Sequence, residues 1–184
     1  KWNTQIVPLV QTFNILIDFC LRRKEFDRVG ELLSRMREDS VKPNEGTFNG
    51  LIKVMRANRD MEGVTRVYEE MKTTENVRPN LSTYNLLLKV FAAARDMPKT
   101  VAILGDMEKA GVSLNALSYS CLLELNVLLG DWDKAEKIVE TMHSQGLTVW
   151  TETVPSILLE TLREPKSNSE EVEKKVWQVL DFSA

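Results

Sequence analysis

The sequence is poor in the residues on which several classes of protein depend. Two distant cysteines, Cys20 and Cys121, cannot build a disulfide framework, and each is expected to pack as a small apolar side chain. The single histidine, His143, has no cysteine or carboxylate around it in a metal-ligand spacing, and no glycine-rich phosphate loop or nucleophile motif occurs. No apolar run approaches the roughly 20 residues that a membrane-spanning helix needs. The sequence therefore predicts no catalytic site, no metal, no cofactor and no membrane segment.

What the sequence does contain is one motif repeated four times at intervals of about 35 residues. Each copy opens on a hydroxyl residue, an aromatic residue and a small polar residue, and each closes on a methionine. The openings are Thr12-Phe13-Asn14, Thr47-Phe48-Asn49, Thr83-Tyr84-Asn85 and Ser118-Tyr119-Ser120, and the methionines are Met36, Met71, Met107 and Met142. Self-similarity at this period is typical of solenoids, whose units bury their apolar faces only by stacking.

Apolar residues within each copy follow the period of an α-helix, once before and once after a short break. The first helix of the first copy carries Phe13, Leu16, Ile17, Cys20 and Leu21, and the second helix of the third copy carries Met97, Val101, Leu104 and Met107. We interpret these stripes as core packing. Gly111 and Gly146 stand where second helices should end.

The predicted fold is all-α, a right-handed superhelical solenoid of about four to five helical hairpins. The expected division, in residue numbers, is 1–9 for the end of a preceding unit or a flank, 10–44, 45–80, 81–115 and 116–150 for four repeats, and 151–184 for a divergent repeat or helical cap.

Together these motifs resemble the pentatricopeptide repeat, with a P-class-like pattern over roughly residues 10–150. The resemblance rests on Thr-Phe/Tyr-Asn followed by leucine, on Glu69-Glu70-Met71, and on the junctions Val41-Lys42-Pro43-Asn44 and Val77-Arg78-Pro79-Asn80. The tetratricopeptide repeat has a similar period, but its Trp-Leu-Gly pattern is missing.

Membership would imply binding of single-stranded RNA, with one base read by each repeat. In the family the fifth and last residues of a repeat read the base and the second residue flanks it. The implied reading pairs are Asn14 with Asn44, Asn49 with Asn80, Asn85 with Asn115, and Ser120 with Trp150, and the flanking residues are Gln11, Gly46, Ser82 and Leu117. Paired asparagines in the family favour pyrimidines, usually cytosine over uracil, and we expect each pair to converge on its own nucleotide.

Other interpretations of these positions stay open. The asparagines at 14, 49 and 85 are also tolerated as polar residues in the first turn of a helix. Trp150 either stacks on a base or packs against the C-terminal segment. The flanking residues are not the valine common in the family, and one extra residue near Thr73-Thr74-Glu75 shifts Asn80.

The charge distribution agrees with a polyanionic partner better than the net charge of -3 does. The first-helix segments carry +2, +2, +2 and -1, whereas the second-helix segments carry -1, -2, -1 and -2. In the family the first helices line the RNA-binding side. The candidate phosphate contacts are Arg22, Arg23, Lys53, Arg56, Arg59, Lys89 and Arg95.

Three readable repeats would contribute on the order of 3–9 kcal/mol, against an association cost of roughly 4–15 kcal/mol. We therefore expect the chain to act with further repeats, with a second copy, or inside a larger ribonucleoprotein. The expected role is RNA splicing, stabilisation, processing or translation in a chloroplast or mitochondrion, with a targeting peptide outside this sequence. The alternative is a protein-binding scaffold of an organellar complex with little RNA selectivity.

Overall fold

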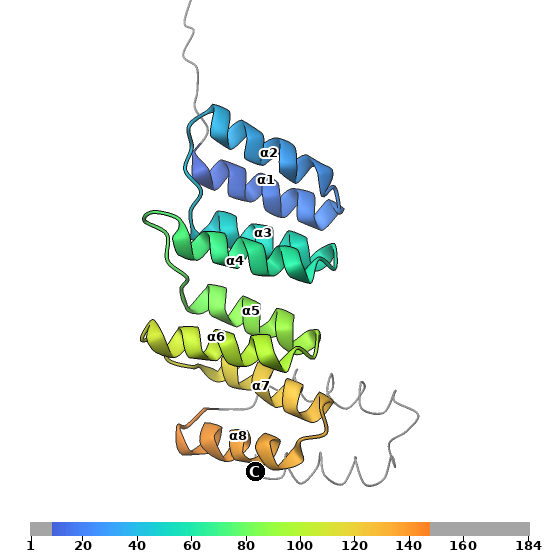
Figure 1. Ribbon diagram of the computed structural model, residues 1–184, viewed down its shortest axis with the longest axis vertical. Helices are drawn as coiled ribbons and strands as arrows, with labels where there is room; N and C mark the ends of the chain where they lie inside the picture. Colours follow the sequence, from blue (N-terminus) through green and yellow to red (C-terminus); the bar gives the residue numbers. More distant parts are fainter. Residues whose placement is uncertain (1–8, 148–184) are drawn as a thin grey trace, which may run out of the picture. The chain divides into compact units, whose positions relative to one another are not determined.

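A computed structural model describes residues 9–147, and within this range the chain forms eight α-helices and no strand (Figure 1). Trp150 and the whole 151–184 segment, both assigned roles from the sequence, lie outside the described residues. The helices are α1 (Val10–Arg23), α2 (Asp27–Glu38), α3 (Glu45–Ala57), α4 (Met61–Thr73), α5 (Leu81–Ala93), α6 (Met97–Lys109), α7 (Ala116–Leu128) and α8 (Trp132–Ser144).

The helices fall into antiparallel pairs, which confirms the all-α hairpin fold. The chain divides into two compact units between Thr83 and Tyr84. In the first unit α1 packs on α2, α3 packs on α4, and α1 also packs on α3, so the first helices of the two hairpins form a common layer. In the second unit α7 packs on α8, and the Tyr84 hydroxyl of α5 donates to the carbonyl of Asp106 in α6 at 3.5 Å. Two helices lie in each interval expected for a repeat, although the repeat boundaries themselves stay a prediction.

From α3 onward the helices begin at a residue whose side chain accepts a hydrogen bond from the first turn, whereas α1 and α2 have no side-chain cap. Asn44 and Asn115 cap α3 and α7, and the hydroxyl three residues later completes a capping box in both. Asp60, Asp96 and Asp131 cap α4, α6 and α8 by accepting from the backbone N–H three residues on. An aspartate at this recurring position is a signal that the sequence interpretation missed.

First helices end in the same way in every hairpin. Lys24, Arg59, Arg95 and Gly130 occupy the left-handed region, with φ between 56° and 74°. The next backbone N–H returns to a carbonyl five residues earlier, as in Asp60 N–H to the Met55 oxygen at 2.9 Å. The turn is so short that the residue making this bond in the last three hairpins is also the aspartate that starts the second helix. Gly111 and Gly146, both left-handed, follow α6 and α8 as predicted.

The core consists of the aromatic, aliphatic and methionine stripes, and both cysteines are buried in it as predicted. Two stripe predictions are wrong. Leu16 is 40% exposed, while its counterpart Leu51 is 8% exposed because α1 packs against α3. Val101 is 56% exposed, because α6 turns Thr100, Ile103 and Met107 inward instead. Burial of Thr100 is tolerated since its hydroxyl donates to the Asp96 carbonyl at 2.8 Å.

Among the described helices, none is both long and apolar enough to cross a membrane.

Candidate nucleic-acid interface

Three polar side chains from two successive hairpins meet at the N-terminal end of α3. Asn14 in α1 donates from Nδ2 to Oδ1 of Asn44 at 3.0 Å, and its own Oδ1 accepts from the Thr47 hydroxyl at 2.7 Å. Asn44 Oδ1 also accepts from the Thr47 backbone N–H at 3.1 Å, so it caps α3 as well. The fifth and last residues of the first predicted repeat therefore lie in direct contact, although 30 residues separate them in the chain.

The same arrangement recurs in the second unit. Asn85 donates from Nδ2 to Asn115 Oδ1 at 3.3 Å and accepts from the Ser118 hydroxyl at 2.5 Å. Asn115 Oδ1 in turn accepts from the Ser118 backbone N–H at 3.0 Å. The two clusters, Asn14/Asn44/Thr47 and Asn85/Asn115/Ser118, are called the amide clusters below.

The bridging hydroxyls of Thr47 and Ser118 were not among the predicted site residues. Their signal in the sequence is Asn-x-x-Thr/Ser at the start of each first helix, which is also the capping-box pattern. Each hydroxyl donates a hydrogen bond to the oxygen of the fifth-position carboxamide. Consequently the orientation of Asn14 and Asn85 is set before any ligand arrives.

Each amide cluster keeps hydrogen-bonding capacity after its internal bonds are made. A carboxamide offers two N–H donors and an oxygen with two lone pairs. Asn44 and Asn115 use their oxygens in the cluster, and within the described residues neither Nδ2 group takes part in a hydrogen bond. The Nδ2 groups of these last-position amides are therefore unused donors, and each lies beside a fifth-position carboxamide that is already held by hydrogen bonds.

The second predicted repeat lacks such a cluster. Asn80 is exposed and accepts from the Thr83 backbone N–H at 3.1 Å, but it is not bonded to Asn49. Asn49 Oδ1 is buried and accepts no hydrogen bond within the described residues. This departure coincides with the extra residue between α4 and α5. An unsatisfied buried acceptor costs about 1–3 kcal/mol, so this carboxamide favours any donor brought to it.

In the fourth predicted repeat, Ser120 is buried and its hydroxyl has no partner within the described residues. Its predicted partner Trp150 lies outside them.

The predicted flanking residues Gln11, Gly46, Ser82 and Leu117 are all exposed. Gly46 has a steric reason to be glycine. A Cβ at this position would lie 2.7 Å from Asn14 Nδ2 and 3.2 Å from Asn44 Oδ1. The missing side chain thus leaves room for the amide cluster of the first unit.

Cations lie beside the fifth positions of the two middle repeats only. Lys53 follows Asn49 by four residues and Lys89 follows Asn85 by four, so each lies one helical turn away on the same face. Both lysines are exposed, and neither has an ion pair within the described part of the chain. Asp18 and Glu124 hold the corresponding positions in the first and fourth repeats. Of the four fifth positions, only those in the second and third repeats therefore have a cation one turn further along the same helix.

The remaining predicted phosphate contacts lie toward the C-terminal ends of first helices. Arg22 pairs with Asp18 at 2.8 Å, and Arg23 stacks over the Phe19 ring at 5.2 Å. Such exposed pairs contribute about 0–1 kcal/mol, so a phosphate can replace them. The other contacts, Arg56, Arg59 and Arg95, are exposed.

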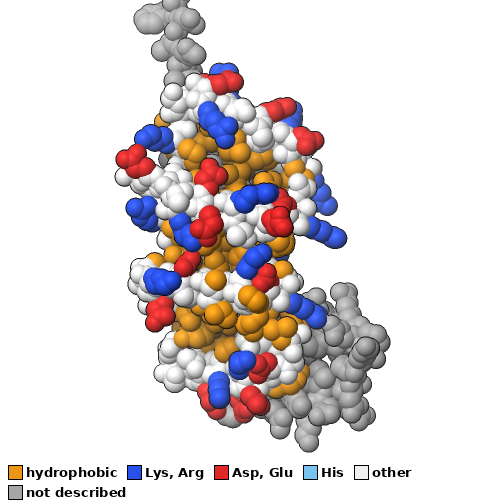
Figure 2. Space-filling model, in the orientation of Figure 1, with side chains coloured by type: hydrophobic (Ala, Val, Ile, Leu, Met, Phe, Trp, Pro, Cys, Tyr) orange, Lys and Arg blue, Asp and Glu red, His pale blue; other side chains and the backbone are white. Residues whose placement is uncertain are grey.

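Charges of both signs share the face that Figure 2 draws. The face in Figure 2 shows Lys/Arg and Asp/Glu side chains interspersed rather than gathered in a block of one sign. In α7, burial raises the pKa of the Cys121 thiol to about 11, and the nearby Glu124 adds to this effect against Lys89. No group of His, Cys, Asp and Glu within residues 9–147 could hold a metal ion.

Comparisons with known proteins bear on the family and the fold of the chain. Residues 3–164 match the family model described as the pentacotripeptide-repeat region of PRORP. Over 67 residues the chain is 39% identical to a chloroplastic pentatricopeptide repeat-containing protein of Arabidopsis thaliana, a match that covers 36% of this chain and 12% of that protein.

Solved structures show the same fold. The chain is similar to the pentatricopeptide repeat protein PPR10 in complex with an 18-nt psaJ RNA element, with a TM-score of 0.74 and 15% identity over 96% of this chain and 26% of that one. It is also similar to the PPR domain of Arabidopsis thaliana protein-only RNase P 1 in complex with tRNA, with a TM-score of 0.67 and 21% identity over 92% of this chain and 83% of that one.

Proposed function

The chain belongs to the pentatricopeptide repeat family, and from this premise we propose that it binds single-stranded RNA along the first helices of its repeats. The observation that carries the proposal is the recurrence of the amide cluster. Two sites in different units hold a fifth-position carboxamide against a last-position amide with unused N–H donors. The solved relatives PPR10 and RNase P 1, which are described in complex with RNA, support the same partner.

The proposed readout is one base per repeat with a preference for pyrimidines. A free amide N–H can donate to the N3 or O2 acceptors of cytosine, and the remaining acceptor capacity of the cluster suits its exocyclic amine. The pairs Asn14/Asn44 and Asn85/Asn115 are the proposed readers. Each base would lie between the flanking residue of its repeat and the next repeat. Asn49/Asn80 reads a base only if the RNA supplies the donor that Asn49 Oδ1 lacks.

Helical rise ranks the proposed phosphate contacts. Lys53 lies about 6 Å along the helix axis from Asn49, at 1.5 Å per residue, whereas Arg59 lies beyond the end of α3. A nucleotide whose base meets the carboxamide therefore reaches Lys53 or Lys89 first. The cations at the helix ends, Arg22, Arg23, Arg59 and Arg95, would form a second row, and Arg56 lies between.

The direct test is a fluorescence-anisotropy titration of the chain with oligo-C, oligo-U and oligo-A. The proposal predicts tighter binding to the two pyrimidine oligomers, and an affinity that falls as salt rises from about 50 to 200 mM. Equal affinity for all three sequences would refute base reading while leaving RNA binding intact. No binding at low salt would refute the whole proposal.

The second candidate function is a protein-binding scaffold with little RNA selectivity. It is favoured by the net charge of -3 and by the mixed charges of the surface. A chain of this kind would bind little RNA at any salt concentration.

We also propose action in a chloroplast or mitochondrion, which the chloroplastic relative supports. That relative is much longer than this chain, so further repeats, a larger ribonucleoprotein or a second copy are the proposed means of reaching high affinity. Immunoblotting of purified organelles with antibodies to the native protein tests the location.

A further inference from the structure

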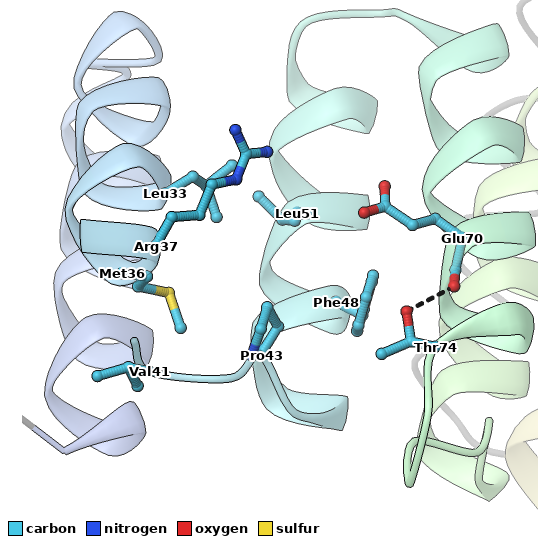
Figure 3. A pocket seen from close by; sticks show the side chains of 9 residues that line it. All are labelled: Leu33, Met36, Arg37, Val41, Pro43, Phe48, Leu51, Glu70 and Thr74. Atoms are coloured by element: carbon cyan, nitrogen blue, oxygen red, sulfur yellow. Dashed lines mark hydrogen bonds between the residues drawn. The ribbon is translucent and has the colours of Figure 1, made fainter. Parts of the chain in front are cut away.

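The first unit contains a cavity on the side of its second helices. The volume is about 320 Å³, at the small end of the range for ligand pockets. Figure 3 shows α2 on one side, α3 at the back and α4 on the other. The lining comprises Leu33, Met36 and Arg37 of α2, Val41 and Pro43 of the connection, Phe48 and Leu51 of α3, and Glu70 and Thr74 at the end of α4.

The second unit has a different pair of side chains at the positions that correspond to Phe48 and Thr74. The counterparts of Phe48 and Thr74 are Tyr119 and Gln145, each 71 positions further along the chain. There the amide of Gln145 donates to the Tyr119 hydroxyl at 3.2 Å, so the two side chains meet across the same location. Phe48 has no hydroxyl, and the Thr74 hydroxyl donates to the Glu70 carbonyl of its own helix at 2.7 Å. The first unit therefore has neither of the two groups that form this hydrogen bond in the second unit.

The mouth of the cavity carries one charge of each sign. Arg37 comes from α2 and Glu70 from α4, both are exposed, and neither forms an ion pair within residues 9–147. In Figure 3 both charged groups lie on the same side of the apolar lining. The counterpart positions in the second unit hold Glu108 and Thr141. Of the two units, only the first therefore has this pair of opposite charges.

We infer that this cavity is a docking site for a peptide segment of a protein partner. The segment inserts one aliphatic or aromatic side chain between α2 and α4, places an acidic residue against Arg37, and places a basic residue against Glu70. Apolar burial supplies the affinity, and the two unpaired charges fix the direction of the peptide. A peptide fits better than a free apolar ligand, because its neighbouring residues can present an apolar side chain together with a charge of each sign.

The site leaves the amide clusters accessible. At 100° per residue, Phe48 and Leu51 face about 150° away from Asn49 and Lys53 around the axis of α3. A partner in the cavity and RNA along the first helices can therefore bind at the same time. The inference is independent of the proposed function, because it does not use the amide clusters.

The probe is a phage-displayed library of random peptides selected on the immobilised whole chain. Enriched peptides should share one Leu, Ile, Met or Phe flanked by an acidic residue on one side and a basic residue on the other. A synthetic copy of an enriched peptide should bind the chain in calorimetry and should not be displaced by oligo-C.

Two variants make the test decisive. Phe48→Tyr with Thr74→Gln copies the pair that the second unit already accommodates, so it should fill the cavity in a folded chain and weaken the peptide at least tenfold. Arg37→Glu with Glu70→Arg should reject the same peptide and accept one with its charges exchanged. Asn85→Ala is the control and should bind the peptide as the parent does. Failure to enrich any such motif, equal binding to the filled variant, or displacement by oligo-C would overturn the inference.

Discussion

At the residue scale, Asn115 combines two tasks that one substitution can separate. Its Oδ1 caps α7 and accepts from Asn85, while its Nδ2 is the donor to the base in the proposed readout. Aspartate caps a helix as well as asparagine does, but it replaces the free N–H donor by an acceptor. A carboxylate matches the N3–H donor of uracil and not the N3 acceptor of cytosine.

We therefore predict that Asn115→Asp changes base preference without loss of fold. Its affinity for oligo-U should rise relative to oligo-C by about tenfold, since one correct pairing contributes about 1–3 kcal/mol. Anisotropy titrations measure the ratio, and urea denaturation should give a free energy of unfolding within about 0.5 kcal/mol of the parent. An unchanged C-to-U ratio would show that Asn115 is only a helix cap.

Gly46 offers a second test at this scale, with Gly30 as the matched control. Alanine in a helix interior is normally about 0.5–1 kcal/mol more stable than glycine. Gly30→Ala in α2 should show this gain, because nothing lies within 4 Å of the new Cβ. Gly46→Ala should lose it, because its Cβ displaces Asn14 from Asn44 at a cost of about 1 kcal/mol.

Urea denaturation of the two glycine variants gives the comparison, and anisotropy shows whether RNA affinity falls for Gly46→Ala only. A gain of stability at Gly46 equal to that at Gly30 would mean that the Asn14–Asn44 bond has no energetic role.

Cys121 predicts a dependence of stability on alkaline pH. Its thiol pKa is raised from 9.0 to about 11 in the folded chain, so the unfolded state loses its proton first. The stabilisation is therefore complete below about pH 9 and disappears as pH rises toward 11. Between about pH 8 and 10.5 the parent should lose on the order of 1–2 kcal/mol more than Cys121→Ala, measured by urea denaturation at each pH. Parallel pH profiles of the two chains would contradict the assignment.

At the element scale, the ends of the first helices combine a strained backbone with positive charge. Lys24, Arg59 and Arg95 stand in the left-handed region, where glycine is free of the steric cost and where the fourth hairpin has Gly130. A cation there interacts favourably with the negative end of the helix dipole, and this interaction offsets part of the steric cost. Local stability alone would accept glycine at each of these ends.

We predict that Arg59→Gly leaves the free energy of unfolding unchanged or raises it by up to about 1 kcal/mol. Its RNA affinity should fall less than that of Lys53→Ala, which removes a cation one turn from Asn49. Asn76→Gly, at another left-handed residue with φ 62° but no charge, is the control for the backbone effect. A larger loss of RNA affinity at Arg59 than at Lys53 would reverse the proposed ranking of phosphate contacts.

At the scale of the whole molecule, the distribution of charge matters more than its sum. A chain with a net charge of -3 binds RNA only if the cations lie where the phosphates run. Lys53 and Lys89 are the proposed points, one on each of the two middle first helices. Lys109 and Lys137 are exposed cations on second helices and lie outside the proposed interface.

The double variant Lys53→Ala with Lys89→Ala should therefore reduce the slope of log affinity against log salt by about 1.4, at 0.7 per phosphate contact on a single strand. Lys109→Ala with Lys137→Ala changes the net charge equally and should leave the slope as it is. Titrations over a series of salt concentrations measure both. Equal slopes for the two double variants would mean that RNA affinity depends on the net charge of the chain and not on phosphate contacts at Lys53 and Lys89.

The sequence predicted the helical pairs because helix formation and capping depend on residues a few positions apart. The recurring aromatic, leucine and methionine positions predicted the hairpins, and Gly111 and Gly146 predicted where two second helices end. The same reasoning failed at Leu16 and Val101, since burial depends on which neighbouring helix covers a face, and periodicity does not contain that information.

What the sequence determined by itself is the local part of this protein: hairpins of fixed period, capped by asparagine and aspartate and stacked through apolar stripes. The tertiary structure alone decided that Asn14 meets Asn44 under a bridging hydroxyl, that Asn49 remains without a donor, and that Phe48 and Thr74 leave a cavity. The physical reason is distance along the chain. Contacts between residues about 30 positions apart depend on the exact fit of neighbouring side chains, and one added residue or one missing hydroxyl changes them while the helices stay the same.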